Sequence, residues 1–179
     1  MSTCRLTNNL EKKDCRYTVS GIRSVYLANF DPTIVYSKNG DGVITEIELP
    51  ESEAFYRVDP QDNSASWSDE LAVNSNGGKY RTHTLNISIA KYDTELLNQA
   101  DALSLGKFIA VVVDRAGRAV LLGGTNGLSA TSFNYASGAA ESDAGGWTGV
   151  FTGTASETAP LLESEAIIVP LHAGTQINP

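Results

Sequence analysis

The sequence predicts a mainly β protein, an antiparallel β-sandwich or barrel with one flanking α-helix. Its β-branched and aromatic residues occur in short runs about ten residues apart, and clusters of Gly, Asn, Asp and Ser separate the runs. Only one stretch has the spacing of an amphipathic helix. With 179 residues, the chain fits a single domain that buries roughly 70% of its unfolded surface.

The chain divides into three parts. Residues 1–20 are polar and lack a regular period, which is typical of an arm, and residues 21–160 form the expected domain. Within the domain, residues 21–29 are partly apolar on both faces, which indicates an inner strand. Residues 161–179 form a C-terminal extension, whose apolar run we expect to be either an arm that docks on a neighbour or an edge strand.

Turn residues at positions 38–42 predict a tight hairpin, because Asn, Gly and Asp tolerate positive φ. The Asp-Gly pair resembles part of a calcium loop, but the spaced carboxylates and the final bidentate Glu are missing. A strand is expected on the C-terminal side of this turn, at residues 43–49.

A long hairpin is expected over residues 63–91. In its second strand, residues 79–91, Leu85, Ile87 and Ile89 point to one side. The polar side of the hairpin comprises Ser64, Ser66, Ser68 and Glu70 from the first strand and Thr82, Thr84, Asn86 and Ser88 from the second. Asp69 interrupts the apolar side. The tip consists of Asn74, Ser75, Asn76, Gly77 and Gly78, and a hairpin of this length can reach beyond its own subunit.

The predicted helix covers about residues 93–105. Asp93 or Thr94 can serve as the N-cap, and Gly106 ends the helix. Its apolar stripe comprises Leu96, Leu97, Ala100, Leu103 and Leu105. We expect this helix to cover one face of the hairpin that follows it.

That following hairpin is apolar on both faces in its first strand, residues 108–113, and returns through residues 118–122. Asp114 is expected to support the turn that leads to Gly117. Two further strands are expected at residues 129–135 and 147–154.

Charge and composition exclude several classes of function. The net charge is −8 and the pI is about 4.7, so the chain lacks the basic surface that specific nucleic-acid binding requires. No apolar run approaches the ~20 residues of a membrane span, and the N-terminus lacks the apolar core of a signal peptide. We therefore expect a soluble protein made in the cytoplasm, with Cys4 and Cys15 free and reduced.

The sequence contains no pattern of catalytic residues. There is no nucleophile motif, dinucleotide fingerprint or zinc-ligand pair, and we expect no metal and no cofactor. His83 lies near the end of the hairpin and is interpreted as a partly buried structural residue, whereas His172 is interpreted as incidental. The sequence therefore predicts a protein that is not an enzyme.

The order of these segments resembles the tail tube and tail-ring proteins of tailed bacteriophages, in the divergent form of phages of Bacteroides-like bacteria and crAss-like phages. The resemblance spans roughly residues 14 to 160 and rests on the series of segments 14–15, 21–30, 85–91, 108–117 and 121–128, followed by the loop 137–146 and Pro160. No single motif carries it. The extension after residue 160 departs from the shortest members of that family.

The resemblance implies a structural virion protein, made in the host cytoplasm and located in the tail. Such subunits join their sheets into a hexameric ring with a β-lined bore, and stacked rings form a tube through which DNA passes. It further implies that the polar side of the hairpin lines the lumen and that residues 74–78 contact the next ring. The expected partners are other copies of the chain and neighbouring tail or connector proteins, with DNA only in transit and no membrane.

Two other functions are compatible with the same features. One is a head–tail adaptor ring that does not stack. The other is a monomeric carbohydrate-binding β-sandwich, in which Trp67, Trp147 and Tyr135 would form a stacking platform. In the alternating pattern of their strands, these three aromatic residues fall on the same side as the core residues, which favours a structural role for them.

Overall fold

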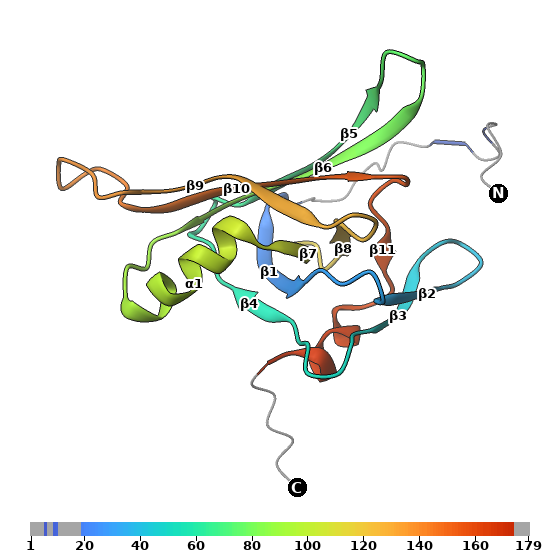
Figure 1. The fold of residues 1–179 in the computed structure, drawn as a ribbon, viewed down its shortest axis with the longest axis horizontal. Coiled ribbons are helices and arrows are strands. Elements are labelled where there is room, and N and C mark those ends of the chain that lie inside the picture. Colours follow the sequence, from blue (N-terminus) through green and yellow to red (C-terminus); the bar gives the residue numbers. More distant parts are fainter. Residues whose placement is uncertain (1–5, 7–8, 11–18, 174–179) are drawn as a thin grey trace, which may run out of the picture.

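The computed structural model describes residues 6, 9, 10 and 19–173 and confirms that the protein is mainly β (Figure 1). Its strands are β1 (Ile22–Asn29), β2 (Val35–Lys38), β3 (Ile44–Glu48), β4 (Tyr56–Val58), β5 (Ser66–Val73), β6 (Lys79–Ile89), β7 (Lys107–Asp114), β8 (Ala119–Leu122), β9 (Leu128–Ala136), β10 (Gly146–Ala155) and β11 (Leu161–Leu162). The helix α1 covers Thr94–Leu105, and two short 3₁₀ helices, η1 (Glu165–Ile167) and η2 (Val169–Leu171), follow β11.

The strands form one mixed sheet that bends into two layers. The strand order is β2-β3-β11-β8-β7-β9-β10-β6-β5, while β1 pairs with the other edge of β7 and β4 pairs with β1. Only Lys107 and Phe108 of β7 pair with β9, so the sheet turns at this point. Strands β9, β10, β6 and β5 then form the upper layer in Figure 1, and β1, β7 and β8 lie beneath them.

Two apolar clusters hold the layers together. The first lies between the layers and joins Leu85 and Ile87 of β6 and Phe151 of β10 to the facing side chains of β1, β7 and β8. The second lies on the opposite side of β1, β7 and β8 and includes Ile44 and Ile168. Strand β7 is therefore buried on both faces, as its apolar run predicts.

Local signals place several elements correctly. Asp93 caps α1, because its side chain accepts a hydrogen bond from the backbone N–H of Leu96, and Gly106 is the C-cap. The β7–β8 turn uses Asp114 as predicted, since its carboxylate accepts from the backbone N–H of Arg118 at 2.7 Å. Gly117 has a φ of +85°, a conformation that favours glycine.

The position of α1 differs from the prediction. The helix packs mainly against β9, and not over the β7–β8 hairpin. Leu96 and Leu103 contact the first cluster, while Leu97 and Leu105 remain exposed. Of the predicted apolar stripe, Leu96 and Leu103 therefore face the protein, and the stripe did not indicate which strand the helix packs against.

The segment after residue 160 lies in the body of the protein. Strand β11 lies between β8 and β3, antiparallel to the first and parallel to the second, with Leu162 opposite Ile44. Ile168 is buried in the second cluster, and Phe55 forms a parallel bridge to His172. The sequence placed residues 161–179 in an extension; of these, 161–173 are described.

Candidate functional site

The upper layer has one face against the first cluster and one face that is mostly polar. The register places Asn86 of β6 between Ser66 of β5 and Val150 of β10, and Thr84 between Ser68 and Thr152. The next outward pair, Glu70 and Thr82, continues the pattern. We call this surface the hydroxyl face; its members are Ser66, Ser68, Glu70, Thr82, Thr84, Asn86, Ser88, Ser129, Ser132, Asn134, Thr148, Val150, Thr152 and Thr154.

Seven of the eight lumen candidates predicted from the sequence lie on this face. The exception is Ser64, because β5 begins only at Ser66 and Ser64 belongs to the preceding turn. Its hydroxyl donates to the backbone oxygen of Gln61 at 2.6 Å. The Gln61 side chain also accepts from the hydroxyl of Ser88 at 3.2 Å, so this turn covers one end of the face.

Sequence reasoning missed the half of the face that β9 and β10 contribute. Thr148, Thr152 and Thr154 alternate along β10 with inward-facing residues such as Phe151. This alternation was visible in the sequence. Its location beside β6 was not, because the two strands are about sixty residues apart in the chain.

The hydroxyl face carries one charged side chain, Glu70, and no Lys or Arg. Its polar groups contact one another both between strands and along one strand. Asn86 donates to the hydroxyl of Ser66 at 3.2 Å, and the hydroxyl of Ser68 donates to Glu70 at 3.5 Å. Such a surface offers hydrogen bonds without fixed positive charge.

The two sides of the upper layer end in strand edges that have no partner among the described strands. Strand β5 pairs with β6 alone. Strand β9 pairs with β7 only at Leu128 and Ser129, which leaves the edge from Ala130 to Ala136 open. Charged residues commonly protect exposed edges, but β9 contains none.

The predicted tip, residues 74–78, forms a closed turn at the end of a hairpin that projects from the body (Figure 1). The side chain of Asn74 accepts from the backbone N–H groups of Asn76 and Gly78, and the backbone N–H of Asn74 donates to the oxygen of Gly78. Gly77 has a φ of +79°. All five residues are exposed.

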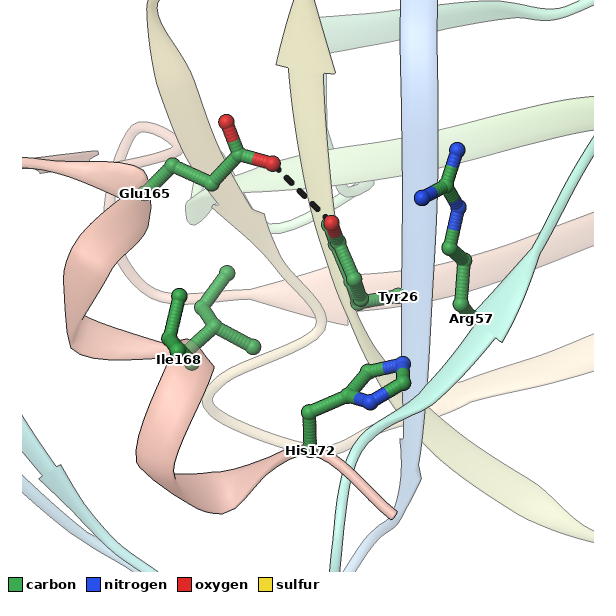
Figure 2. Close-up of a pocket in the computed structure, with 6 residues that line it drawn as sticks. Tyr26, Arg57, Glu165, Ile168 and His172 are labelled. Atoms are coloured by element: carbon green, nitrogen blue, oxygen red, sulfur yellow. Dashed lines mark hydrogen bonds between the residues drawn. The ribbon is translucent and has the colours of Figure 1, made fainter. Parts of the chain in front are cut away.

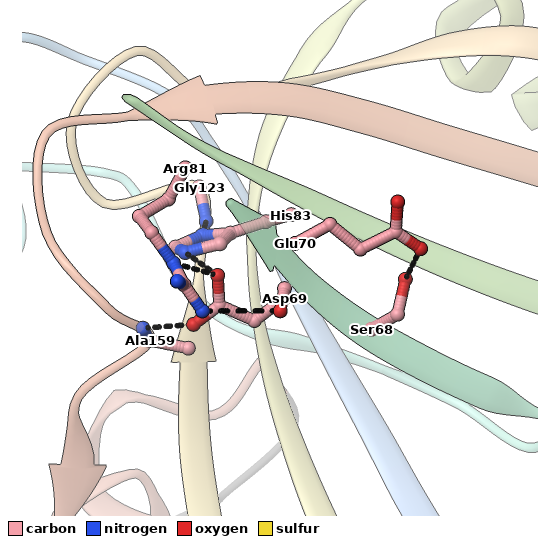
Figure 3. Close-up of polar contacts among 7 residues, drawn as sticks. All are labelled: Ser68, Asp69, Glu70, Arg81, His83, Gly123 and Ala159. Atoms are coloured by element: carbon pink, nitrogen blue, oxygen red, sulfur yellow. Dashed lines mark hydrogen bonds and ion pairs between the residues drawn. The ribbon is translucent and has the colours of Figure 1, made fainter. Parts of the chain in front are cut away.

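Asp69 anchors the root of this hairpin to the body (Figure 3). Its carboxylate accepts from Nε of Arg81 at 2.7 Å and from the backbone N–H of Ala159 at 3.0 Å. His83 lies beside it, with Nε2 at 3.7 Å from the Asp69 carboxylate, and its Nδ1 accepts from the backbone N–H of Gly123 at 3.2 Å. This anchor explains why an acidic residue interrupts the apolar side of β5.

His83 is fully buried, and not only partly buried as the sequence suggested. Burial lowers the pKa of His83, and the nearby charge of Asp69 offsets only part of this effect. For Asp69, burial raises the pKa, but the hydrogen bonds from Arg81 and Ala159 outweigh it and leave the pKa below its usual value. His83 is thus a neutral imidazole beside the Asp69 carboxylate. The guanidinium group of Arg81 and the backbone N–H of Ala159 hold that carboxylate in place.

A small cavity of about 210 Å³ lies on the other side of the molecule, lined by Tyr26, Arg57, Glu165, Ile168 and His172, among others (Figure 2). The hydroxyl of Tyr26 donates to Glu165 at 2.9 Å, and Arg23 forms an ion pair with the same carboxylate. His172, interpreted from sequence as incidental, contacts the ring of Tyr26 edge-on. These contacts attach the C-terminal segment to β1.

The aromatic residues proposed for a carbohydrate platform lie in two places. Trp147 stacks on Phe133 at 4.9 Å and lies near Tyr135 and Tyr92, at the end of the β9–β10 hairpin. Trp67 packs separately against the first cluster, opposite Leu85. The three residues therefore do not form a single stacking surface.

Comparisons with known proteins add no family to these observations. A scan against protein-family models, a search of curated proteins and a search of solved structures each found no match. Within the described residues, no group of three or more His, Cys, Asp or Glu is placed to hold a metal ion, and no helix has the length and hydropathy to cross a membrane.

Proposed function

We propose that the protein is a structural subunit of a ring whose bore is lined by the hydroxyl face, in the tail tube or a tail ring of a tailed bacteriophage. The observation that carries the proposal is a four-stranded layer with a polar, nearly uncharged outer face and an open strand edge on each side. The role in a phage tail follows from the resemblance described above.

The composition of the hydroxyl face suits a channel for DNA. A polyanion binds to Lys and Arg through counterion release, so a bore lined by these residues would hold DNA in place. Hydroxyl and amide groups keep the wall hydrated without such attraction. The net charge of −8 acts in the same direction, because it disfavours non-specific binding of DNA to the rest of the ring.

The strand directions suit closure of a ring. Strands β9, β10, β6 and β5 alternate in direction, so β5 runs antiparallel to β9. When β5 of one copy meets β9 of the next, every joint in the ring is antiparallel and no open edge remains. Six copies supply 24 strands, and strands about 4.8 Å apart with a tilt of about 35–40° give a backbone diameter of roughly 45–50 Å, which accommodates duplex DNA.

The test is the assembly state of the purified protein, measured by native mass spectrometry and negative-stain electron microscopy at increasing concentration. We expect closed rings with a central opening, or tubes of stacked rings. Single unstacked rings at all concentrations would favour an adaptor ring. A monomer at every concentration, even after addition of tail-tip components, would contradict the proposal.

A further inference from the structure

The two open edges of the upper layer are offset along the strand direction. Through β10, Tyr135 of β9 lies in line with Ile89 of β6, and Ser129 lies in line with Thr84. Strand β5 lies in line with a different part of β6, from Asn86 to Lys79. Strand β9 is therefore displaced relative to β5 by about four residues along β6.

This offset has the size that closure of a barrel requires. Four residues of about 3.3 Å, accumulated over four strands about 4.8 Å apart, correspond to a strand tilt of about 35°. Closed barrels have tilts of about 35–45°, and an eight-stranded barrel with a shear of eight residues tilts by about 36°. The offset is also an even number of residues, so the outward side chains of adjoining copies stay on one face.

The hydrogen-bonding groups of the two edges are in phase as well. At the hairpin tip the N–H of Asn74 donates to the oxygen of Gly78, and the antiparallel alternation then directs the N–H and C=O groups of Trp67 and Asp69 to the open edge of β5. The same alternation continues across β6 and β10. It directs the backbone N–H and C=O groups of Phe133 and Tyr135 to the open edge of β9.

We propose that β5 of one copy pairs with β9 of the next copy in one register, with Trp67 opposite Tyr135 and Ser68 opposite Asn134. This inference rests on the proposed ring and specifies its joint. Asp69 then lies opposite Phe133, and Glu70 opposite Ser132. Inward residues meet inward residues, and the hydroxyl face continues from one copy to the next without a break.

The register also covers apolar side chains that a single copy leaves in water. Tyr135 is 42% exposed and Leu71 is 56% exposed. The joint places Tyr135 against the partly buried Trp67 of the adjoining copy, and it places Leu71 beside Ala130. An aromatic pair across strands stabilises a joint of this kind.

Disulfide formation tests the register. In a background with Cys4 and Cys15 replaced by Ser, we would introduce Ser68→Cys and Asn134→Cys together. The phase described above makes this a non-hydrogen-bonded pair, with Cα atoms about 4.5 Å apart, which suits a disulfide. Strands β6 and β10 separate the two positions within one copy, so the bond forms only between copies.

Under mild oxidation at a concentration that gives rings, we expect a ladder of covalent oligomers on a non-reducing gel, reversed by dithiothreitol. The matched control is Ser68→Cys with Ser132→Cys, which keeps the face but shifts the pairing by two residues. Its diagonal separation of about 7–8 Å exceeds the disulfide range, and we expect at least tenfold less product.

The outcomes separate this inference from the proposed ring. Rings that are visible by electron microscopy but crosslink better through the control pair would overturn the register and leave the ring intact. A monomer that gives no ladder with either pair would overturn both. A ladder from Ser68→Cys with Asn134→Cys, and little from the control, supports the joint as described.

Discussion

Strands β6 and β7 belong to the same sheet but obey different constraints. Strand β7 is buried on both faces, and Phe108 to Val113 are all apolar. Strand β6 alternates between a buried face with His83, Leu85, Ile87 and Ile89 and the outer hydroxyl face. The composition of β7 follows from core packing alone. The outer face of β6 contributes to neither core cluster, so its composition reflects contact with something other than the core.

The comparison indicates that the outer face of the upper layer is where the sequence depends on something other than folding. Folding requires only that the outer side of a half-buried sheet be polar, and charged residues usually meet that requirement. Here Ser, Thr and Asn occupy most of it, across four strands drawn from two separate hairpins of the chain. The proposed bore would account for this composition, because a channel for DNA requires a hydrated wall without positive charge.

The largest effect is expected from a charge on the buried face of β6. Ile87 is 1% exposed, so Ile87→Asp places a carboxylate in the first cluster without a partner, which costs more than about 4 kcal/mol and prevents folding. The matched control on the same strand is Asn86→Asp, which should change the free energy of unfolding by less than about 0.5 kcal/mol. Circular dichroism with urea unfolding measures both. Equal losses would remove the distinction between the two faces.

A smaller effect is expected from pH, through the buried histidine on the inner face. Because burial lowers the pKa of His83 in the folded state, the unfolded chain binds the additional proton more readily below pH 6.5. Stability is therefore complete above pH 6.5 and decreases as the pH falls through the range between the unfolded and folded pKa values. Asp69, whose pKa is lowered by folding, contributes stability above about pH 3.8 that is lost below it.

Urea unfolding between pH 5 and 8 measures this dependence. In His83→Gln the side-chain oxygen can still accept from Gly123, and we expect the slope of stability against pH between 5 and 6.5 to flatten. The control is His172→Gln, which removes the other histidine of the sequence. An unchanged slope in His83→Gln would show that His83 is not the titrating group.

The sequence was sufficient where the signal is local. Period-two alternation placed β6, the apolar run placed β7, and Asp93 with Gly106 bounded α1. It was insufficient where pairing joins distant segments. Strand β2 is only four residues long with a half-exposed Val35, and β11 is recognisable only by its place between β3 and β8.

The candidate site divides in the same way. Half of the hydroxyl face lies on one hairpin, so its alternation could be predicted from adjacent strands. The other half depends on the pairing of β10 with β6, which no local pattern specifies. Asp69 was visible as an exception to the apolar parity of β5, but its partners Arg81 and Ala159 come from two other parts of the chain.

The smallest effect on stability is expected at the hairpin tip, which lies farthest from both clusters. Replacement of residues 73–79 by Asn-Gly removes the tip and keeps Ala72 opposite Tyr80, which is the hydrogen-bonded pair that a two-residue hairpin turn requires. The free energy of unfolding should therefore change by less than about 0.5 kcal/mol. The proposed ring predicts that single rings still form while tubes of stacked rings are lost, because the projecting tip is the part placed to contact the next ring. Electron microscopy of the variant beside the parent protein at equal concentration measures this. Tubes of normal length would show that stacking uses another surface, whereas loss of the rings themselves would mean that the tip contributes to the joint between copies.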